Sequence, residues 1–270
     1  MHTKRLEAGP IPFRAAHRGL VLELAKREIF GRYRGANLGV VWAILSPFLM
    51  LGVYTMAFGE ILQARWPGVE STSGFVLVLF VGLSIHSFFA ECITRAPSLI
   101  FANANYVKKV IFPLEILPWP VVISALFHLA LNVVVLIAGI WFVNGRVAPT
   151  VFLLPIVLLP LLPVVLGAVW LLSAIGTYVR DIAQLMGPLA TALLFLSSAI
   201  VPVGAVPEKY RWIFEANPLT LIIDQARVVT LDGRVPDAQA LLYYSATATI
   251  FAALSFLLFR RLRGGFADVL

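Results

Sequence analysis

The sequence predicts an all-α integral membrane protein with six transmembrane helices per chain. Three observations lead to this fold class. The 270 residues are 60% hydrophobic and only 13% charged, with a mean hydropathy of +0.91, whereas soluble domains carry about 25% charged residues. The apolar residues form long uncharged runs, and basic residues are concentrated in particular segments between these runs.

Six uncharged runs set the transmembrane prediction. They are Leu38–Phe58, Ser71–Ala90, Ile116–Val143, Val147–Val179, Ile182–Val206 and Ala238–Phe259. Each is close to or beyond the roughly 20 residues that a helix needs to cross about 30 Å of hydrocarbon. We therefore expect one transmembrane domain, 1–270, with spans at 37–59, 73–93, 114–143, 148–179, 182–202 and 238–259. The alternative, six helices buried in a soluble core, leaves too little polar surface.

Prolines interrupt the apolar runs without excluding the spans, since neighbouring helices can satisfy the carbonyl groups that a proline frees. Pro155, Pro160 and Pro163 lie close together in the fourth run. We expect them to kink or interrupt that span, because proline removes a helical hydrogen bond and clashes with the preceding turn.

The distribution of basic residues predicts the orientation. Residues 1–36 lack the apolar core and small-residue cleavage site of a signal peptide, so we expect them in the cytoplasm. Six spans then return the 260–270 tail to the same side. This assignment places fifteen of the 21 Lys and Arg residues inside and six outside, in agreement with the positive-inside bias. Nucleic-acid binding would need the positive charge on one soluble face, so we expect no nucleic-acid partner.

The segment before the first span predicts an interface helix. Leu22, Ala25, Ile29 and Tyr33 fall on one helical side, and the charged residues fall mostly on others. Such a basic amphipathic helix suits the cytoplasmic surface of a membrane, although an ordinary charged flank is the alternative. The residues that we expect to meet the membrane or a lipid head group are Arg27, Arg32, Tyr33 and Arg34.

The cytoplasmic segment 94–112 is too polar to span comfortably and too apolar for a floppy loop. Ser98–Lys109 is expected to form one short helix that ends before Pro113. Its polar residues would face the cytosol, while Leu99 and Ile100 pack inward. A rigid helix between two spans suits contact with a partner protein, and a simple basic loop is the alternative. The candidate contact residues are Arg95, Ser98, Asn103, Asn105, Tyr106, Lys108 and Lys109.

Two further connections carry predictions. Arg180 and Asp181 are expected to form a tight cytoplasmic turn, with Asp181 capping the helix that follows. The outer segment 203–237 contains two short helical patterns, Glu208–Phe214 and Leu219–Val229, separated by Asn217–Pro218. Helices that enter the bilayer and return need protein around their ends, so we expect a re-entrant outer gate, with a surface loop as the alternative. The gate candidates are Pro202, Pro207, Tyr210, Trp212, Asn217 and Pro218.

The chain shows no sign of enzymatic or metal chemistry. Cys92 is the only cysteine, and the four histidines are scattered without metal-ligand spacing. The sequence contains no GxxxxGK[ST] phosphate loop and no GxSxG motif. We therefore expect no catalytic residue, metal or cofactor on this chain. His128 and Asn132, one helical turn apart, are the best intramembrane polar pair.

Five stretches in this order resemble the permease subunits of bacterial ABC exporters for polysaccharides. They are "RYRGANLGVVWAILSPFLMLGVYTMAFG", "NANYVKKVIFPLEILP", "VRDI", "PEKYRWIFEANPLTLIIDQAR" and "RRLRGGFADVL". The resemblance covers nearly the whole chain, and its strength lies in the joint order and spacing of the pieces. It implies a protein of the bacterial inner membrane that exports lipid-linked O-antigen, capsule or teichoic acid.

The resemblance also implies partners. Such permeases are homodimers of six-span halves that work with two copies of a separate ATPase chain. ATP and Mg²⁺ would then bind the partner ATPase, and 95–109 would correspond to the coupling helix that contacts it. The N-terminal helix would correspond to the interface helix of this class, and 202–227 to its outer gate.

A polar glycan needs a wet path, because its hydroxyls lose water without replacement in hydrocarbon. Aromatic walls can contact sugar rings, and the candidates are Trp42, Phe48, Tyr54, Phe58, Phe88, Phe89 and Phe195. Packing or lipid contact is the alternative for each. Arg32 and Arg34 could attract the pyrophosphate of a lipid carrier. Two rival functions share some of these features: an ABC permease for a drug or other small molecule, and a membrane-embedded lipid-modifying enzyme.

Overall fold

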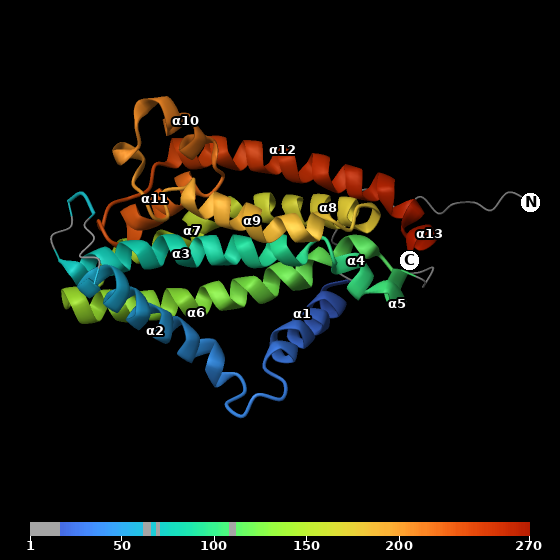
Figure 1. Ribbon diagram of the computed structural model, residues 1–270, viewed down its shortest axis with the longest axis horizontal. Coiled ribbons are helices and arrows are strands. Elements are labelled where there is room, and N and C mark those ends of the chain that lie inside the picture. Colours follow the sequence, from blue (N-terminus) through green and yellow to red (C-terminus); the bar gives the residue numbers. More distant parts are fainter. Residues whose placement is uncertain (1–16, 62–65, 69–70, 108–111) are drawn as a thin grey trace, which may run out of the picture.

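A computed structural model describes residues 17–61, 66–68, 71–107 and 112–270. Long helices run side by side along the longest axis of the molecule (Figure 1). α1 and α2 slope away from these helices and converge at the turn that joins them. One end of the molecule holds the short helices α4, α5 and α13, and the other holds α10 and α11. We call these the α4/α5 end and the α10/α11 end.

The described residues form helices joined by short turns. In chain order these are α1 (Arg18–Arg32), α2 (Val41–Tyr54), the π-helix η2 (Thr55–Ile61), α3 (Thr72–Arg95), α4 (Leu99–Ala102), α5 (Ala104–Val107), η3 (Leu114–Ile116), α6 (Pro118–Asn144), η4 (Pro149–Leu153), α7 (Leu154–Leu158), α8 (Leu161–Tyr178), α9 (Ile182–Phe195), η5 (Val203–Ala205), α10 (Glu208–Ala216), α11 (Thr220–Thr230), α12 (Ala238–Leu262), η6 (Arg263–Gly265) and α13 (Phe266–Val269).

Four helical segments are long and apolar enough to cross a membrane: Thr72–Arg95, Leu114–Asn144, Pro149–Tyr178 and Ala238–Val269. They coincide with the second, third, fourth and sixth predicted spans. Shorter apolar helices, Val41–Ala57 and Ile182–Phe195, occupy the first and fifth. The protein is therefore a multi-pass membrane protein.

The fifth predicted span, 182–202, is longer than the helix found there. α9 ends at Phe195, and the chain continues through turns. Leu196 adopts φ −95° and ψ 24° and donates its amide to the carbonyl of Ala192. The run carries no charge, and we did not predict that the helix stops there.

The proline-rich fourth segment is interrupted as predicted. α7 ends at Leu158 and α8 begins at Leu161, with Pro160 at the N-cap position of α8. Proline is tolerated at the start of a helix, where its missing N–H has no helical partner. The break lets α7 pack beside α11 while α8 packs along α12.

α3 lies at the centre of the packed helices, with most of its residues buried. Glycine permits two close approaches in this core. A Cβ on Gly82 of α3 would lie 2.7 Å from the Cα of Ala199, and a Cβ on Gly167 of α8 would lie 2.8 Å from the Phe251 ring of α12. The backbones therefore approach more closely than a larger residue would allow.

The segment 94–112 differs from the single helix expected over Ser98–Lys109. It forms two one-turn helices, α4 and α5, which are separated at Asn103. The Asn103 side chain donates to the Leu99 carbonyl at 2.9 Å, a local bond of the kind that competes with helix continuation. Lys108 and Lys109 lie outside the described residues.

α4 is nevertheless firmly packed. Leu99 and Ile100 are buried, as expected for their inward role. A Cβ on Gly176 of α8 would lie only 2.6 Å from the Cα of Pro97. The Arg180 guanidinium lies 5.0 Å from the centre of the Phe101 ring, within cation–π range.

Asp181 does not cap α9 with its side chain, so that prediction is wrong. Its backbone is already helical, with φ −67° and ψ −18°. An N-cap side chain reaches the free amides from an extended backbone conformation, which Asp181 does not adopt.

Candidate functional site

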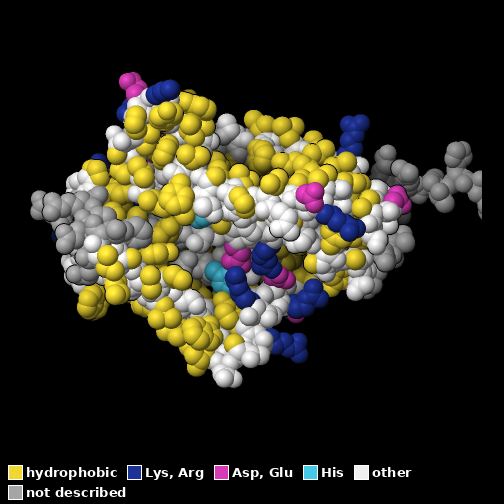
Figure 2. All heavy atoms as spheres, in the orientation of Figure 1, with side chains coloured by type: hydrophobic (Ala, Val, Ile, Leu, Met, Phe, Trp, Pro, Cys, Tyr) yellow, Lys and Arg dark blue, Asp and Glu magenta, His cyan; other side chains and the backbone are white. Residues whose placement is uncertain are grey.

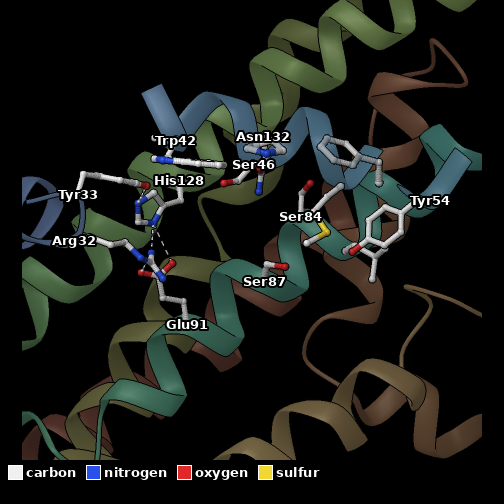
Figure 3. A pocket seen from close by; sticks show the side chains of 15 residues that line it. Arg32, Tyr33, Trp42, Ser46, Tyr54, Ser84, Ser87, Glu91, His128 and Asn132 are labelled. Atoms are coloured by element: carbon white, nitrogen blue, oxygen red, sulfur yellow. Dashed lines mark hydrogen bonds and ion pairs between the residues drawn. The ribbon is translucent and has the colours of Figure 1, made fainter. Parts of the chain in front are cut away.

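A polar cavity lies between α2, α3 and α6, with a volume of about 330 Å³ (Figure 3). α2 contributes Trp42 and Ser46, and its far end contributes Tyr54. The other lining residues are Arg32, Tyr33, Ala43, Pro47, Met50, Phe80, Leu83, Ser84, Ser87, Glu91, His128 and Asn132. The cavity is therefore lined by Arg32 and Tyr33 from the predicted interface helix and by residues of α2, α3 and α6.

Helical spacing explains why the polar residues converge. Ser84, Ser87 and Glu91 stand three and four residues apart on α3, so they share one face. His128 and Asn132 of α6 are four residues apart, and the structure places this predicted polar pair on the same cavity. Figure 3 shows the side chains from the different helices pointing toward a common space.

Four uncharged polar side chains line the cavity. They are Ser46, Ser84, Ser87 and Asn132. Polar groups within apolar helices usually face protein partners or a water-filled space. Ser84 is buried and Asn132 is half-buried, while Ser46 and Ser87 are exposed in the single chain, so these groups can meet water or a hydroxyl-bearing ligand in the cavity.

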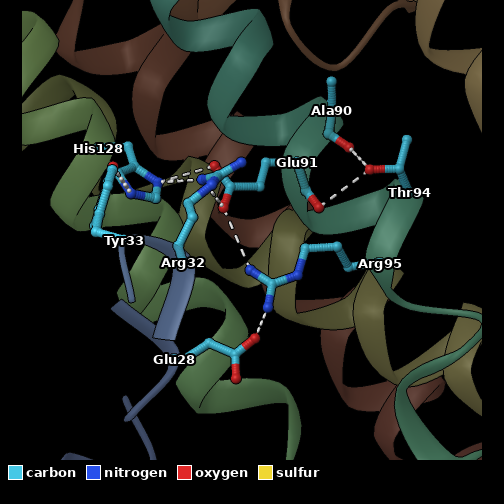
Figure 4. Close-up of polar contacts among 8 residues, drawn as sticks. All are labelled: Glu28, Arg32, Tyr33, Ala90, Glu91, Thr94, Arg95 and His128. Atoms are coloured by element: carbon cyan, nitrogen blue, oxygen red, sulfur yellow. Dashed lines mark hydrogen bonds and ion pairs between the residues drawn. The ribbon is translucent and has the colours of Figure 1, made fainter. Parts of the chain in front are cut away.

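A charged cluster closes the cavity toward α1 (Figure 4). Arg32 Nη1 donates to Glu91 Oε1 at 2.9 Å. His128 Nδ1 lies 3.0 Å from Glu91 Oε2 and 2.9 Å from Arg32 Nη1, and its Nε2 lies 3.0 Å from the Tyr33 hydroxyl. A proton on Nδ1 would donate to Glu91 and leave Nε2 to accept from Tyr33.

Burial raises the pKa of the Tyr33 phenol above its usual 10.0. The phenol therefore stays neutral and remains a hydrogen-bond donor at physiological pH. The carboxylate of Glu91 is mostly buried, with 14% of its side chain exposed, while Arg32 is half-exposed. The cluster thus pairs the solvent-accessible guanidinium of Arg32 with the mostly buried carboxylate of Glu91.

Arg95 extends the cluster along α3. Its Nη1 lies 3.3 Å from Glu91 Oε1, and its Nη2 pairs with the carboxylate of Glu28 on α1. Two arginines and two glutamates therefore balance one another. On the face shown in Figure 2, basic, acidic and histidine side chains gather in a hollow surrounded by hydrophobic surface.

This pairing changes the role expected for Arg32 and Arg34. The sequence suggested that both could attract a pyrophosphate, but Arg32 already has the Glu91 carboxylate as its counter-ion. Arg34 is exposed and lies outside the cluster. Arg27 donates to the Tyr106 hydroxyl at 3.2 Å, which connects α1 to α5.

α1 also buries a different face from the one expected. Val21, Leu24 and Ala25 are buried, and the helix packs on α6. Leu22, expected on the apolar side, is 54% exposed. Ala25 belongs to both the expected and the observed buried face. The ion pairs of Glu28 and Arg32 with α3 determine how α1 is turned about its axis.

The remaining coupling candidates gather around α4 and α5. Arg95 belongs to the charged cluster, and the Ser98 hydroxyl donates to the Arg95 carbonyl at 3.2 Å. Asn105 is exposed. The Tyr106 ring stacks on Phe112, with the ring centres 4.5 Å apart.

The six aromatic candidates whose side chains are described divide into three groups. Trp42 and Tyr54 line the cavity. Phe48 and Phe195 are exposed, at 47% and 57%, away from its lining. Phe88 and Phe89 are buried in the core of the single chain, at 3% and 5%, and so pack against other helices. Phe58 falls in η2, but its side chain is not among those described.

The outer segment forms the two expected short helices, α10 and α11. Pro202 and Pro207 precede η5 and α10 at their N-cap positions, while Tyr210 and Trp212 are exposed on α10. Asn217 ends α10, and the Pro218 carbonyl accepts a hydrogen bond from Tyr244 at 2.7 Å.

Asn217 and α11 complete the end of α9. The Asn217 amide donates to the carbonyls of Leu193 and Leu196, each at 2.9 Å. Arg227 is 7% exposed and donates to the carbonyls of Val78, Ser198 and Ala199. Carbonyl groups at a buried helix end need such partners.

Sequence reasoning also missed Glu28, Glu91 and Arg227 as structural polar residues. Glu91 and Arg95 are one helical turn apart, which signals a local ion pair. No such signal connects them to α1, because Glu28 and Arg32 are 59 or more positions earlier in the chain. Among the described residues, no group of three His, Cys, Asp or Glu residues is arranged to hold a metal ion.

Comparison with known proteins gives a consistent family. The model of the ABC-2 type transporter family matches residues 19–231. The O-antigen export system permease protein RfbA of Myxococcus xanthus is 28% identical over 257 residues, which cover 93% of this chain and 95% of the relative. RfbA of Klebsiella pneumoniae is 24% identical, with the same coverage of 93% and 95%.

A second group of relatives carries a different name. The polysialic acid transport protein KpsM of Escherichia coli is 23% identical over 235 residues, which cover 85% of this chain and 88% of the relative. The family match includes α1, the polar cavity, the 94–112 segment and the α9–α11 region. The chain therefore belongs to the ABC-2 type transporter family.

Proposed function

We propose that this chain is the membrane subunit of an exporter that moves lipid-linked polysaccharide across the bacterial inner membrane. O-antigen-type glycans are favoured over capsule or teichoic acid. The observation that carries this proposal is the end-to-end match with O-antigen export permeases, which leaves no large part of either chain unaligned. The weaker match to KpsM extends the same transport chemistry to a capsule-type polymer.

The proposed assembly contains two copies of this chain and two copies of a separate ATPase, to which ATP and Mg²⁺ bind. Each chain would cross the membrane six times, with both termini and the α4/α5 end in the cytoplasm. The exposed apolar side of α9 supports a partner copy, since Leu185, Leu189 and Phe195 are 60%, 42% and 57% exposed. Large exposed apolar residues need lipid or protein cover.

The polar cavity supports a role in carrying a hydroxylated substrate. A glycan in hydrocarbon loses hydrogen bonds to water, and it needs protein groups or trapped water to replace them. Ser84, Ser87 and Asn132 supply such partners within apolar helices. Two copies that bring their cavities to a common path would provide a hydrated route through the bilayer.

The region 94–112 is proposed to receive force from the ATPase. Pro97 lies tightly against Gly176 of α8, and α4 and α5 follow directly after Arg95 of α3. Arg27 and Glu28 of α1 contact Tyr106 and Arg95. Displacement of this packed unit would therefore move α1 and α3 together and alter the width of the cavity between α2 and α3.

The α10–α11 region is proposed as the outer gate. Its short helices are held to α9 and α3 by the buried hydrogen bonds of Asn217 and Arg227. Movement of α9 or α3 would therefore be transmitted to α10 and α11. The exposed Tyr210 and Trp212 stand on the gate helix, where they can meet the interfacial region of the bilayer.

The experiment is reconstitution of this chain with its cognate ATPase in lipid vesicles that contain a fluorescent lipid-linked glycan. ATP and a glycosidase are added on the ATPase side, and glycan moved to the opposite side is measured by its protection from the glycosidase. ATP-dependent transfer is expected. A complex that hydrolyses ATP and transfers a small amphipathic drug but no glycan would overturn the proposal.

A further inference from the structure

We propose that the cavity between α2, α3 and α6 binds a segment of uncharged sugar residues in preference to acidic ones. This inference rests on the proposed function, and it adds the substrate class that the cavity selects. Trp42, Ser84, Glu91 and Asn132 come from three different helices and face the same space (Figure 3). The ligand class follows from the hydrogen-bonding groups, the aromatic surfaces and the charge balance of this lining.

The hydrogen-bonding groups fit a polyhydroxylated ligand. Ser84 is 6% exposed and lines the cavity. Ser46 and Ser87, both exposed, add two more hydroxyls, and the half-buried Asn132 adds an amide. A hydroxyl donates and accepts, and an amide does both through separate atoms. The lining can therefore match sugar hydroxyls in either role.

Aromatic rings mark the two ends of the cavity lining on α2. Trp42 lies beside the charged cluster, and Tyr54 lies toward the far end (Figure 3). Twelve residues separate them, which corresponds to roughly 18 Å along a helix. The apolar face of a sugar ring can pack on an aromatic side chain while its rim forms hydrogen bonds. A cavity of this length accommodates a short oligosaccharide segment.

The charges in the lining and directly beside it disfavour an anionic ligand. Arg32 and His128 face Glu91, and Arg95 faces both Glu91 and Glu28 (Figure 4). The two guanidiniums are thus balanced by two carboxylates. A carboxylate-bearing sugar would have to displace Glu91 from its partners, and repulsion by that side chain opposes its entry. A neutral sugar meets no such barrier.

Calorimetry on the complex of this chain with its ATPase in nanodiscs tests the preference. The probes are a linear heptamer of glucose and a linear heptamer of galacturonic acid, measured at neutral pH and physiological salt. We expect the neutral heptamer to bind at least about tenfold more tightly, which is about 1.4 kcal/mol. Equal or tighter binding of the galacturonic acid heptamer overturns the inference.

Two variants place the binding in this cavity. The double substitution Ser84→Ala and Ser87→Ala removes two hydroxyls and should weaken binding of the glucose heptamer roughly five- to a hundredfold. The control is Ser245→Ala on α12, whose hydroxyl donates to the Leu241 carbonyl outside the cavity. It should bind like the unchanged protein. Unchanged binding by the double variant overturns the assignment.

Glu91→Gln tests the charge argument separately. This substitution leaves Arg32 and Arg95 with one fewer counter-charge and should narrow or reverse the preference for the glucose heptamer. An unaltered preference overturns the electrostatic explanation.

The vesicle experiment distinguishes this inference from the proposed export function. Glycan transfer without binding of either heptamer refutes only the cavity assignment, whereas heptamer binding without glycan transfer refutes the proposed export function.

Discussion

The Arg227 guanidinium donates a hydrogen bond to the backbone carbonyl oxygen of Ser198, with a nitrogen–oxygen distance of 2.7 Å. The same guanidinium lies 4.5 Å from the centre of the Trp66 ring and also bonds Val78 and Ala199 carbonyls. One side chain of α11 therefore holds the chain after α9 against α3. Bonds from a charged donor to buried carbonyls are stronger than neutral ones.

Arg227→Met should destabilise the membrane domain strongly. The substitution keeps an apolar stem but leaves the carbonyls of Val78, Ser198 and Ala199 without this donor. We expect a loss of about 3–5 kcal/mol, measured as a lower midpoint of denaturation in detergent. Arg227→Lys retains one charge and fewer donors, so its loss should be smaller. A Met variant as stable as the unchanged protein would contradict the role of Arg227.

Gly82→Ala should disturb the same junction through packing. The added Cβ would lie 2.7 Å from the Cα of Ala199 and 2.9 Å from Arg227 Nη2. Overpacking of this kind costs about 1–3 kcal/mol, which lowers the melting temperature by several degrees. Gly52→Ala is the matched control on α2, because nothing lies within 4 Å of its added Cβ. Equal melting temperatures for the two variants would refute the close contact.

The Arg32–Glu91 pair should contribute measurably to the docking of α1. Arg32→Gln and Glu91→Gln, made singly and together, form a double-mutant cycle. Because Arg32 is half-exposed, we expect a coupling free energy of only about 1 kcal/mol. Hydrogen exchange in Arg18–Arg32 is the measurement, and it should increase in each single variant. A coupling energy of zero would show that the pair does not hold α1.

The C-terminal tail should stabilise the α4/α5 end. Phe266 is fully buried beside Phe259 and Tyr178, and Arg263 pairs with Glu115. Phe266→Ala should cost about 3 kcal/mol, because a large buried ring leaves a cavity. Limited proteolysis should then release the tail at lower protease concentrations. Val269→Ala serves as a mild comparison, and equal cleavage of both variants would argue against anchoring by Phe266.

Asn105 provides a test of the proposed coupling segment. It is exposed on α5, so Asn105→Ala should leave the membrane domain folded and its melting temperature within about 2 °C of the unchanged protein. Glycan transfer per ATP hydrolysed should fall several-fold if this surface meets the ATPase. Asn144→Ala at the other end of α6 is the control. Full transfer by the Asn105 variant would place the ATPase contact elsewhere.

The helical organisation was readable from the sequence where a local signal existed. Pro160 marked the break between α7 and α8, and Asn217–Pro218 marked the end of α10. These residues act through their own backbone, so their effect does not depend on distant partners. The end of α9 at Phe195 was missed because its partners lie far along the chain. Asn217 bonds the carbonyls of Leu193 and Leu196, and Arg227 bonds the carbonyl of Ser198 beyond the helix.

The candidate site was only partly readable. His128 and Asn132 stood out because they share one helical face, and the cavity contains both. The Arg32–Glu91 and Arg95–Glu28 pairs join helices that are distant in sequence, so no local spacing of residues could indicate these ion pairs. Phe88 and Phe89 show the opposite problem, since aromatic composition alone does not separate a path wall from a packed core.

α9 is 14 residues long, so it rises only roughly 21 Å, about 9 Å less than the hydrocarbon thickness of a typical bilayer. Beyond Phe195 the chain presents turns whose carbonyls are held by Asn217 and Arg227. A crossing at α9 would therefore complete the remaining depth with backbone that is already paired inside the protein, so a mismatch between this short helix and a thicker bilayer would cost little.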